Sequence, residues 1–455
     1  MEEVTCEICG SAEYDVLLNK LWLCEKHNWS KDRIILFYNN VPVNYRNVCC
    51  KQCGLVYINP RMTDEETIEF YKRQYREEFT AGKKNESWKL PFTNLHLGIE
   101  IYNAVVRYDF LERLGYLREG INTLDIGSSL GALPAYLKAK GCNAYGVEIS
   151  QFSEYTKDLF GVDTIFKMTF EDFQTDMKFD IITICDALEH FSHPQKVLLK
   201  IRYMLKDDGI VLIEVPDIFK PHKALLGFFS NAHLFTFSPN SIRNLLNITG
   251  FEVLQFEYGG YCMNMRVIAK KSEAKKMQFK DDFPAIVDFV LRYHKCYSAL
   301  EEYKRGSLSY ESAMAVINET IPEYSVIKFL EALRLIDKGD IAGGKRLLFE
   351  CLQSDFNEEN LCVQKGNIYG LLAIASFNNG DMENAKQFME KAYELLPRFY
   401  DFPYLEELER KGFFDFRGFV FETYLSYIGL SEVREILKKQ QSRYNVKNMR
   451  KKTGR

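Results

Sequence analysis

The sequence predicts an α/β fold in which helices cover a parallel β-sheet, with a cysteine-rich segment before it and a wholly helical region after it. Three observations predict this. Short apolar runs alternate with helical patterns over residues 121–270, paired cysteines gather before residue 60, and helical spacing continues from about residue 272. At 455 residues with 46% hydrophobic residues, the chain is long enough for about two to four domains with buried cores.

Charge and the N-terminal sequence narrow the function classes. A formal net charge of −4 provides no overall field for nucleic acid or a membrane surface. Only residues 438–455 are distinctly basic, and we interpret them as a solvated tail rather than an anionic docking arm. The N-terminus has no apolar signal-peptide core, and no apolar run approaches the roughly 18 residues of a transmembrane helix. We therefore expect a cytoplasmic protein with reduced cysteines that binds no nucleic acid.

Two C-x-x-C pairs stand out in the first sixty residues. The four paired cysteines are Cys6, Cys9, Cys50 and Cys53. Four thiolates suit a closed tetrahedral zinc site, which would organise a segment with little core of its own. Cys24 and His27 form a competing half-site, Cys49 competes with Cys50, and reduced structural thiols are the alternative without metal. We predict a structural zinc-binding module over residues 1–60.

Residues 61–118 read as a helical lid or linker. Thr63 followed three residues later by Glu66 is a capping box that begins a helix. A second helix is expected from Asn94 to Leu117. Its apolar stripe consists of Leu97, Ile101, Ala104, Val105, Tyr108 and Leu111.

Residues 119–271 carry the strand–helix alternation. The apolar runs are INTLDIG, NAYGVEI, VDTIFKM, FDIITIC, GIVLIEV, FEVLQFEY and MNMRVIAK. Continuous apolar strands alternating with helices predict a parallel sheet covered on both faces. No convincing helix separates the last two runs, which predicts a terminal hairpin containing one antiparallel strand.

Residues 272–455 keep helical spacing throughout. Residues 369–397 resemble a tetratricopeptide repeat, and residues 330–352 form a weaker copy. The Gly339–Asp340 turn lies 41 residues before the Gly380–Asp381 turn. We predict a small domain of helical hairpins that offers a surface for a protein partner.

The turn LDIGSSLG, residues 124–131, allows three interpretations. The first interpretation is a plain strand-to-helix turn, the second is a dinucleotide-binding loop, and the third is a loop that binds S-adenosylmethionine. Ser129 stands where a dinucleotide loop carries its second glycine, which disfavours an NAD-dependent enzyme. S-adenosylmethionine has no phosphate, so it tolerates that serine, and its carboxylate can meet amides at the following helix N-terminus. Glu148, at the end of the second run, can accept hydrogen bonds from both ribose hydroxyls.

Three segments in this order and spacing resemble a class I S-adenosylmethionine-dependent methyltransferase. They are TLDIGSSLGALPAYLKAKGCNAYGVEIS, FDIITICDALEHFSHP and HLFTFSPNSIRNLLNITGF. The resemblance implies a Rossmann-like, seven-stranded methyltransferase sheet. It also implies a set of cofactor-binding residues: Asp125, Gly127, Ser128 and Gly131 for the methionyl end, Glu148 for the ribose, Phe170, Glu171 and Asp172 for the adenine region, and Asp186 near the methionyl group.

The segment CGLVYINPRMT behind the cysteine pairs resembles bacterial methyltransferases of deoxysugar and surface-polysaccharide pathways. That resemblance implies a structural zinc module and a nucleotide-linked sugar or polysaccharide end as acceptor. Related sugar C-methyltransferases carry a Tyr-x-Glu-His constellation, and here the positions read Ser230, Asn231, Ala232 and His233. Because only the histidine is retained, we expect O-methylation, with N-methylation as the alternative.

The candidate catalytic residues are His233, His190 and Glu189, with Glu214 as a further carboxylate. His233 is expected to act as a base or as a structural hydrogen-bonding group, and His190 as a pocket wall or a base. His193 is expected to be a local cap before Pro194, and His222 a lid residue. The competing function is a methyltransferase-like scaffold that acts through its helical repeat domain.

Overall fold

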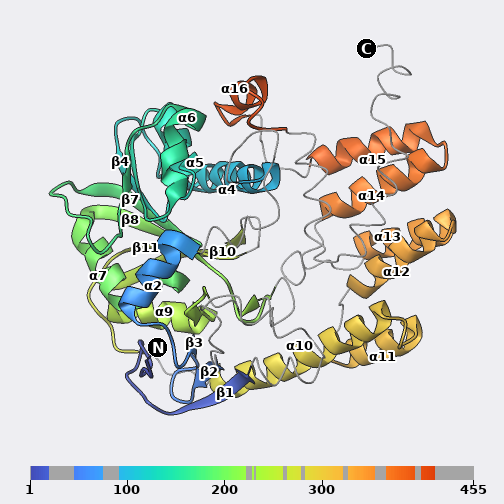
Figure 1. Ribbon diagram of the computed structural model, residues 1–455, viewed down its shortest axis with the longest axis horizontal. Helices are drawn as coiled ribbons and strands as arrows, with labels where there is room; N and C mark the ends of the chain where they lie inside the picture. Colours follow the sequence, from blue (N-terminus) through green and yellow to red (C-terminus); the bar gives the residue numbers. More distant parts are fainter. Residues whose placement is uncertain are drawn as a thin grey trace. The chain divides into compact units, whose positions relative to one another are not determined.

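The computed structural model describes residues 2–19, 46–74, 92–221, 228–229, 232–259, 264–277, 282–320, 326–353, 365–394 and 401–415. The competing half-site of Cys24 and His27, the expected lid residue His222 and the basic tail lie outside these ranges. The chain divides into two compact units, Met1–Val290 with Arg398–Phe414 and Leu291–Pro397 with Asp415–Arg455 (Figure 1). The division falls inside helix α10 (Asp282–Lys304).

A seven-stranded sheet forms the centre of the first unit, in the order β10-β11-β8-β7-β4-β5-β6. The strands are β4 (Asn122–Ile126), β5 (Asn143–Glu148), β6 (Ile165–Lys167), β7 (Phe179–Cys185), β8 (Leu205–Val215), β10 (Phe251–Gly259) and β11 (Asn264–Lys271). Each predicted apolar run is therefore a strand. β11 is antiparallel to both β8 and β10, which confirms the predicted terminal hairpin. The strands β4, β5, β7 and β8 are parallel, so their carboxyl ends meet at one edge of the sheet.

Helices flank this sheet because their apolar stripes must be buried against it. They are α4 (Asn94–Arg113), α5 (Ala132–Ala139), α6 (Thr156–Phe160), α7 (Pro194–Met204) and α9 (Pro239–Ile248). The six residues of the predicted stripe on α4 are all buried. This helix ends before the expected Leu117, because Gly115 takes a φ of +75° that helical backbone does not adopt.

The cysteine-rich segment forms a small second sheet with a strand from the region of the large sheet. Its order is β1 (Tyr14–Asn19), β2 (Arg46–Cys50), β3 (Val56–Ile58) and β9 (Phe235–Thr236), and β3 pairs with β9. Side chains of this segment and of the large sheet belong to one hydrophobic core. The predicted four-part division at residues 60, 118 and 271 stays a prediction. The capping box of Thr63 and Glu66 is present and begins α2 (Asp64–Glu69), which continues as a π-helix over Phe70–Gln74.

The second unit is helical. Beyond α10 its helices are α11 (Tyr310–Thr320), α12 (Val326–Asp337), α13 (Ile341–Gln353), α14 (Lys365–Asn378) and α15 (Met382–Glu394). α12 packs with α13 and α14 with α15 (Figure 1). The Gly339–Asp340 turn in the first hairpin and the Gly380–Asp381 turn in the second have the same conformation. In each turn the glycine has a positive φ, and the aspartate side chain accepts a hydrogen bond from the backbone N–H three residues later.

A short segment that follows the helical hairpins in the sequence belongs to the first unit. It contains α16 (Leu405–Arg410). Phe402 is 2% exposed and contacts Tyr136 of α5 and Phe160 of α6 edge to face. Among the described residues, no helix is both long and apolar enough to cross a membrane.

Candidate functional site

A cavity of about 530 Å³ lies where β4, β5 and β7 end. Such a position, beyond the carboxyl ends of parallel strands, is where open α/β sheets bind ligands. Five residues predicted to bind the cofactor line it, namely Gly127, Glu148, Phe170, Glu171 and Asp186. Segments outside the sheet complete the wall, including Asp64, Thr67, Ile68 and Tyr71 from the helical stretch after the cysteine module.

The turn after β4 depends on left-handed backbone at three positions. Gly127, Ser129 and Gly131 have φ values of +75°, +50° and +79°. A Cβ on Gly127 would lie 2.9 Å from the Cβ of Ala187, so only glycine fits beside the cavity. A Cβ on Gly131 would lie 2.6 Å from the Thr156 side chain, so that glycine allows close helix packing instead.

Glu148 organises this turn as well as lining the cavity. Its Oε2 accepts the backbone N–H of Ser129 at 2.8 Å, and its Oε1 accepts that of Ser150 at 2.7 Å. An ionised carboxylate has about four acceptor positions, so both oxygens keep capacity for a ligand hydroxyl. The residue can therefore hold a ribose and shape the loop at the same time.

Four other predicted cofactor residues lie beside the cavity rather than in its wall. Asp125 is buried and accepts a hydrogen bond from the Thr183 hydroxyl at 2.6 Å. Burial raises its pKa to about 7, against the lowering effects of Thr183 and Arg107. Asp172 accepts the Thr169 hydroxyl at 2.8 Å. The remaining two are Ser128, whose side chain packs on Gly146, and Gly131.

The cavity wall at Phe170 and Glu171 is braced by a lysine that no sequence pattern indicated. Lys200 of α7 donates to the backbone carbonyls of Phe170 at 2.7 Å and Glu171 at 2.9 Å. Its ammonium also lies 4.9 Å from the centre of the Phe170 ring. Two carbonyls held by one cation keep this short loop at a defined distance from the cavity.

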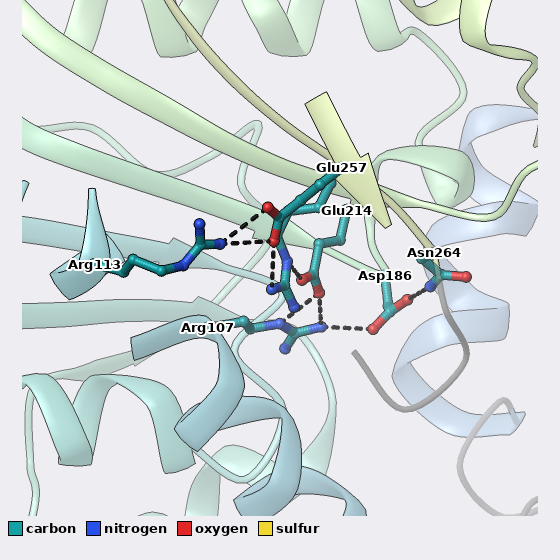
Figure 2. Close-up of polar contacts among 7 residues, drawn as sticks. Arg107, Arg113, Asp186, Glu214, Glu257 and Asn264 are labelled. Atoms are coloured by element: carbon teal, nitrogen blue, oxygen red, sulfur yellow. Dashed lines mark hydrogen bonds and ion pairs between the residues drawn. The ribbon is translucent and has the colours of Figure 1, made fainter. Parts of the chain in front are cut away.

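Asp186 connects the cavity to a buried ion-pair network (Figure 2). Arg107 of α4 donates to Asp186 Oδ2 at 2.7 Å and to Glu214 Oε2 at 2.6 Å. Arg266 donates to the other oxygen of Glu214 at 2.5 Å. Burial alone raises the pKa of Glu214, but the two guanidinium groups outweigh it and hold that pKa below its ordinary value. Glu214, suggested as a further base, is therefore an ion-pair partner instead.

The candidate catalytic residues lie together. Ligand atoms of Glu189, His190 and His233 are within 4.8 Å of one another, and the two imidazole rings meet edge to face at 5.0 Å. His190 lines the cavity, whereas His233 and Glu189 do not. Glu189 is 1% exposed. Burial, reinforced by Asp186, raises the pKa of this carboxyl well above its ordinary value, which favours its protonated form.

Tyr71 completes this cluster, although no sequence pattern indicated it. Its hydroxyl lies 2.8 Å from His190 Nδ1 and donates to the Ala232 carbonyl at 2.6 Å. His190 Nδ1 is also 2.8 Å from that carbonyl, which can only accept. The proton of neutral His190 therefore resides on Nδ1, and the lone pair resides on Nε2.

His193 does not act as the expected cap. It stands at the N-cap of α7, but its side chain makes no capping hydrogen bond. Its Nδ1 lies 2.9 Å from Glu7 and its Nε2 lies 3.3 Å from Asp64. The imidazole instead connects the cysteine-rich segment and α2 to the start of α7, because carboxylates on two segments outcompete the local amide.

The four paired cysteines form one cluster. The Sγ atoms of Cys6 and Cys53 are 3.4 Å apart, those of Cys9 and Cys50 are 3.5 Å apart, and all four lie within 4.8 Å. Tetrahedral zinc–thiolate bonds place sulfurs about 3.8 Å apart, so this donor set fits a zinc ion. Hydrogen bonds from neighbouring thiols lower the pKa of Cys50 to about 2. The thiol of Cys49 points elsewhere, toward the Gly54 carbonyl, so Cys49 does not replace Cys50.

Comparison with known proteins places the central region in a family. The family described as "Methyltransferase domain" matches residues 100–256. N-methyltransferase 4 of Papaver somniferum is 25% identical over 210 residues, which are 43% of this chain and 52% of that protein. The ubiquinone biosynthesis O-methyltransferase of Rickettsia akari is 23% identical over 153 residues, 30% of this chain and 61% of that protein. The chain thus spans about half to three-fifths of these curated relatives.

Solved structures similar to this chain include two methyltransferases. Magnesium protoporphyrin IX methyltransferase from Synechocystis PCC 6803 with bound S-adenosylhomocysteine is 16% identical, with 46% of this chain and 100% of that chain covered and a TM-score of 0.34. An S-adenosylmethionine-dependent methyltransferase from Clostridium acetobutylicum is 12% identical, with 38% and 92% covered and a TM-score of 0.31. The family match identifies residues 100–256 as a methyltransferase domain of the S-adenosylmethionine-dependent kind, and the seven strands, which extend to Lys271, have its Rossmann-like fold.

Proposed function

We propose that this protein transfers the methyl group of S-adenosylmethionine to an oxygen of a small polar acceptor. The acceptor we favour is a nucleotide-linked sugar or a polysaccharide end, in a cytoplasmic pathway of polysaccharide biosynthesis. One observation carries the proposal: residues suited to the cofactor and the imidazole of His190 line the same cavity. The two curated relatives are named as N- and O-methyltransferases, which supports transfer to a heteroatom.

The cavity supports a division between cofactor and acceptor. Gly127, Glu148 and Phe170 line the part that would take the cofactor. Thr67, Ile68 and Tyr71 enter from a different segment, after the cysteine module, and would form the acceptor wall. The two walls come from separate segments. The methyl group of the bound cofactor would lie between these walls and face the acceptor.

The chemistry asks for alignment and one proton acceptor. S-adenosylmethionine, when bound, supplies an electrophilic methyl group on a sulfonium that already is a good leaving group. His190 Nε2 would take the proton of the acceptor hydroxyl as its oxygen forms the new bond to the methyl carbon. The carbon–sulfur bond breaks in the same step, its electron pair stays on sulfur, and the products are a methyl ether and S-adenosylhomocysteine.

His190 replaces His233 as our first candidate for the base. Its ring lines the cavity, and its Nδ1 is 2.8 Å from the Ala232 carbonyl, which favours the tautomer with a basic Nε2. His233, our first candidate from the sequence, would support His190 from behind by edge-to-face contact. An oxygen acceptor needs such a base because a hydroxyl must lose its proton, whereas a neutral amine acceptor attacks through its lone pair.

We further propose that Cys6, Cys9, Cys50 and Cys53 hold a structural zinc ion. Four thiolate ligands close the coordination sphere and leave no position for water, so the metal would have no part in the reaction. Each pair is followed by a glycine in the left-handed region, Gly10 and Gly54, and this glycine donates its N–H to the carbonyl of the first cysteine. Zinc would therefore stabilise the small sheet, whose strand β3 leads directly into the helical segment with the acceptor wall.

The helical hairpins are proposed to form a tetratricopeptide-like domain that binds a protein partner. The repeat of small buried residues supports this interpretation. Gly344 and Ala385 lie 41 residues apart, and a Cβ on Gly344 would lie 2.4 Å from Ile336 of the preceding helix. Close approach of the two helices in a hairpin requires such small residues.

Calorimetric titration tests the leading proposal against its alternative. The enzyme should bind S-adenosylmethionine at micromolar concentration and should convert it to S-adenosylhomocysteine in the presence of nucleotide-linked sugars. Mass spectrometry of the product would show a methyl ether that resists mild acid and base. A protein that binds neither S-adenosylmethionine nor S-adenosylhomocysteine would instead be a scaffold acting through its helical domain.

A further inference from the structure

Asp186 is held in an unusual backbone conformation at the wall of the cavity. Its φ is +53°, and among the described residues only Ser129 shares a positive φ without being glycine. Its backbone N–H donates to the Glu214 carbonyl at 2.9 Å. The side chain is 42% exposed. A strained position of this kind persists only where the surroundings hold it, and here they direct a carboxylate at the ligand space.

Both oxygens of that carboxylate have a protein donor. Arg107 binds Oδ2 at 2.7 Å, and the Asn264 side-chain amide binds Oδ1 (Figure 2). Arg107 comes from α4 and Asn264 from the first position of β11, so elements on two sides of Asp186 hold it. Each oxygen has a second lone pair, which leaves the carboxylate able to bind a cation in the cavity.

The network behind Asp186 explains why Arg107 stays in place. Glu214, Arg266 and Glu257 stand opposite one another on β8, β11 and β10. Three residues of α4, spaced three apart, each contact one of these strand residues. Arg107 binds Glu214, and the Phe110 ring stacks on the Arg266 guanidinium at 4.9 Å. Arg113 binds Glu257 at 2.9 Å. Three residues of helix rise about 4.5 Å, close to the spacing of about 4.8 Å between strands. The helix and the strands therefore keep the same spacing.

From this arrangement we infer that Arg107 and Asn264 are positioning residues, which orient Asp186 to accept a hydrogen bond from the α-ammonium of the cofactor's methionyl part. This inference rests on the proposed function. Three other acidic residues line the cavity. Glu148 organises the loop after β4, Asp64 pairs with His193 at 3.3 Å, and Glu171 belongs to the short loop that Lys200 holds through its backbone carbonyls. An Asp186 carboxyl group that is fixed in this way and paired with the Arg107 guanidinium would select a cofactor that carries an amino-acid end.

Comparing the binding of two ligands distinguishes a role in orienting Asp186 from a general effect on the stability of the protein. S-adenosylhomocysteine carries the α-ammonium, and 5′-methylthioadenosine has the same nucleoside and thioether without it. Asn264→Leu removes one donor of Asp186 and leaves every residue of the ion-pair network intact. Arg107→Lys keeps the charge but cannot reach Glu214 and Asp186 together. Arg113→Gln is the matched control, because this 59% exposed arginine of the same helix pairs with Glu257 at the far end of the network.

Calorimetry should show a selective loss. We expect the Kd of S-adenosylhomocysteine to rise about tenfold in Asn264→Leu and Arg107→Lys, the loss of one well-oriented charged hydrogen bond. The Kd of 5′-methylthioadenosine should stay within about twofold, and Arg113→Gln should change neither value. In turnover, KM for S-adenosylmethionine should rise with kcat nearly unchanged, because the contact is equal in ground and transition states.

Other outcomes are equally informative. Equal weakening of both ligands in Asn264→Leu, with thermal unfolding unchanged, would show that the clamp supports the whole pocket and would overturn the inference. Unchanged affinity for both would overturn it as well. A wild-type protein that binds neither ligand would refute the proposed function itself. Methyl transfer by the wild type without a selective loss in the variants would refute this inference alone.

Discussion

The backbone N–H of Ser129 donates to Glu148 Oε2 at 2.8 Å, which joins the turn after β4 to the end of β5. Because the donor is a backbone N–H, this bond does not depend on the side chain at position 129. The N–H that would approach a pyrophosphate is directed at a carboxylate instead, so the loop presents an acceptor rather than an anion-binding amide. The contact thus favours a ribose-binding loop without phosphate recognition.

The first prediction concerns this turn. Ser129→Gly should leave cofactor affinity nearly unchanged and raise the melting temperature slightly, because glycine adopts the φ of +50° without strain. Gly127→Val should abolish binding, since a Cβ there lies 2.9 Å from Ala187 and the φ is +75°. Calorimetry with S-adenosylhomocysteine measures both. A larger loss of affinity in the serine variant would show that its hydroxyl is a ligand.

The second prediction concerns the base. His190→Gln should lower kcat by about 10²- to 10⁴-fold while cofactor affinity is kept, because it removes the proton acceptor alone. His193→Gln is the comparison variant: this histidine also lines the cavity, but both its nitrogens face carboxylates, so kcat should fall far less. Steady-state rates of the two variants, measured with saturating cofactor, test this prediction. Equal losses in the two variants would remove His190 from the proton-acceptor role.

Tyr71→Phe gives a third, graded prediction. It deletes a hydroxyl that lies 2.8 Å from His190 Nδ1, and it leaves the Ala232 carbonyl, also 2.8 Å from that nitrogen, as the acceptor of the Nδ1 proton. Because the tautomer is kept, we expect kcat to fall only about tenfold, the effect of one lost hydrogen bond. A loss as large as that of His190→Gln would mean that Tyr71 itself takes the proton.

The fourth prediction is a pH dependence from Asp125, whose folded-state pKa of about 7 lies above its ordinary value because of burial. The folded protein then binds more protons than the unfolded chain between about pH 4 and 7. The free energy of unfolding should therefore fall as pH rises through this window and level off above it. Asp125→Asn should reduce this dependence of the free energy of unfolding on pH, as measured by urea titrations at several pH values. An unchanged slope in the variant would assign the dependence to another group.

The fifth prediction tests the cysteine cluster. Cys6→Ser should lower the melting temperature and the zinc content of the purified protein, because it removes one of four converging thiols. Cys49→Ala is the matched control, a buried neighbouring cysteine whose thiol points away from the cluster toward the Gly54 carbonyl. Metal analysis by mass spectrometry should find about one zinc per chain in the wild type and in the control. Equal zinc content in all three proteins would contradict the proposed ligands.

Much of this protein could be predicted from its sequence because the signals are local. The capping box of Thr63 and Glu66, the seven apolar runs and the cysteine pairs each depend on residues a few positions apart, and the described structure contains all of them. Hydrophobic periodicity and turn chemistry act over this short range, so they can be read without knowing the fold. The α/β architecture and its antiparallel hairpin followed from them.

The details of the site depended on contacts between distant segments. Arg107 meets Asp186 across 79 positions, and Tyr71 meets His190 across 119. No local pattern marks an arginine on an amphipathic helix or a tyrosine in a π-helix as part of a site. The same holds for β9, whose two residues join the small sheet across the fold.

The sequence by itself determined the kinds of element, the turn after β4 and the cysteine pairs, because local hydrogen bonding and apolar spacing encode them. Only the tertiary structure decided which histidine lines the cavity, that Glu214 is an ion-pair partner and not a base, and what holds Asp186. Charge pairing and burial depend on which residues are close together in the folded protein, and not on their positions along the chain. They arise only when the sheet brings its strand ends, α4 and the segment after the cysteine module together.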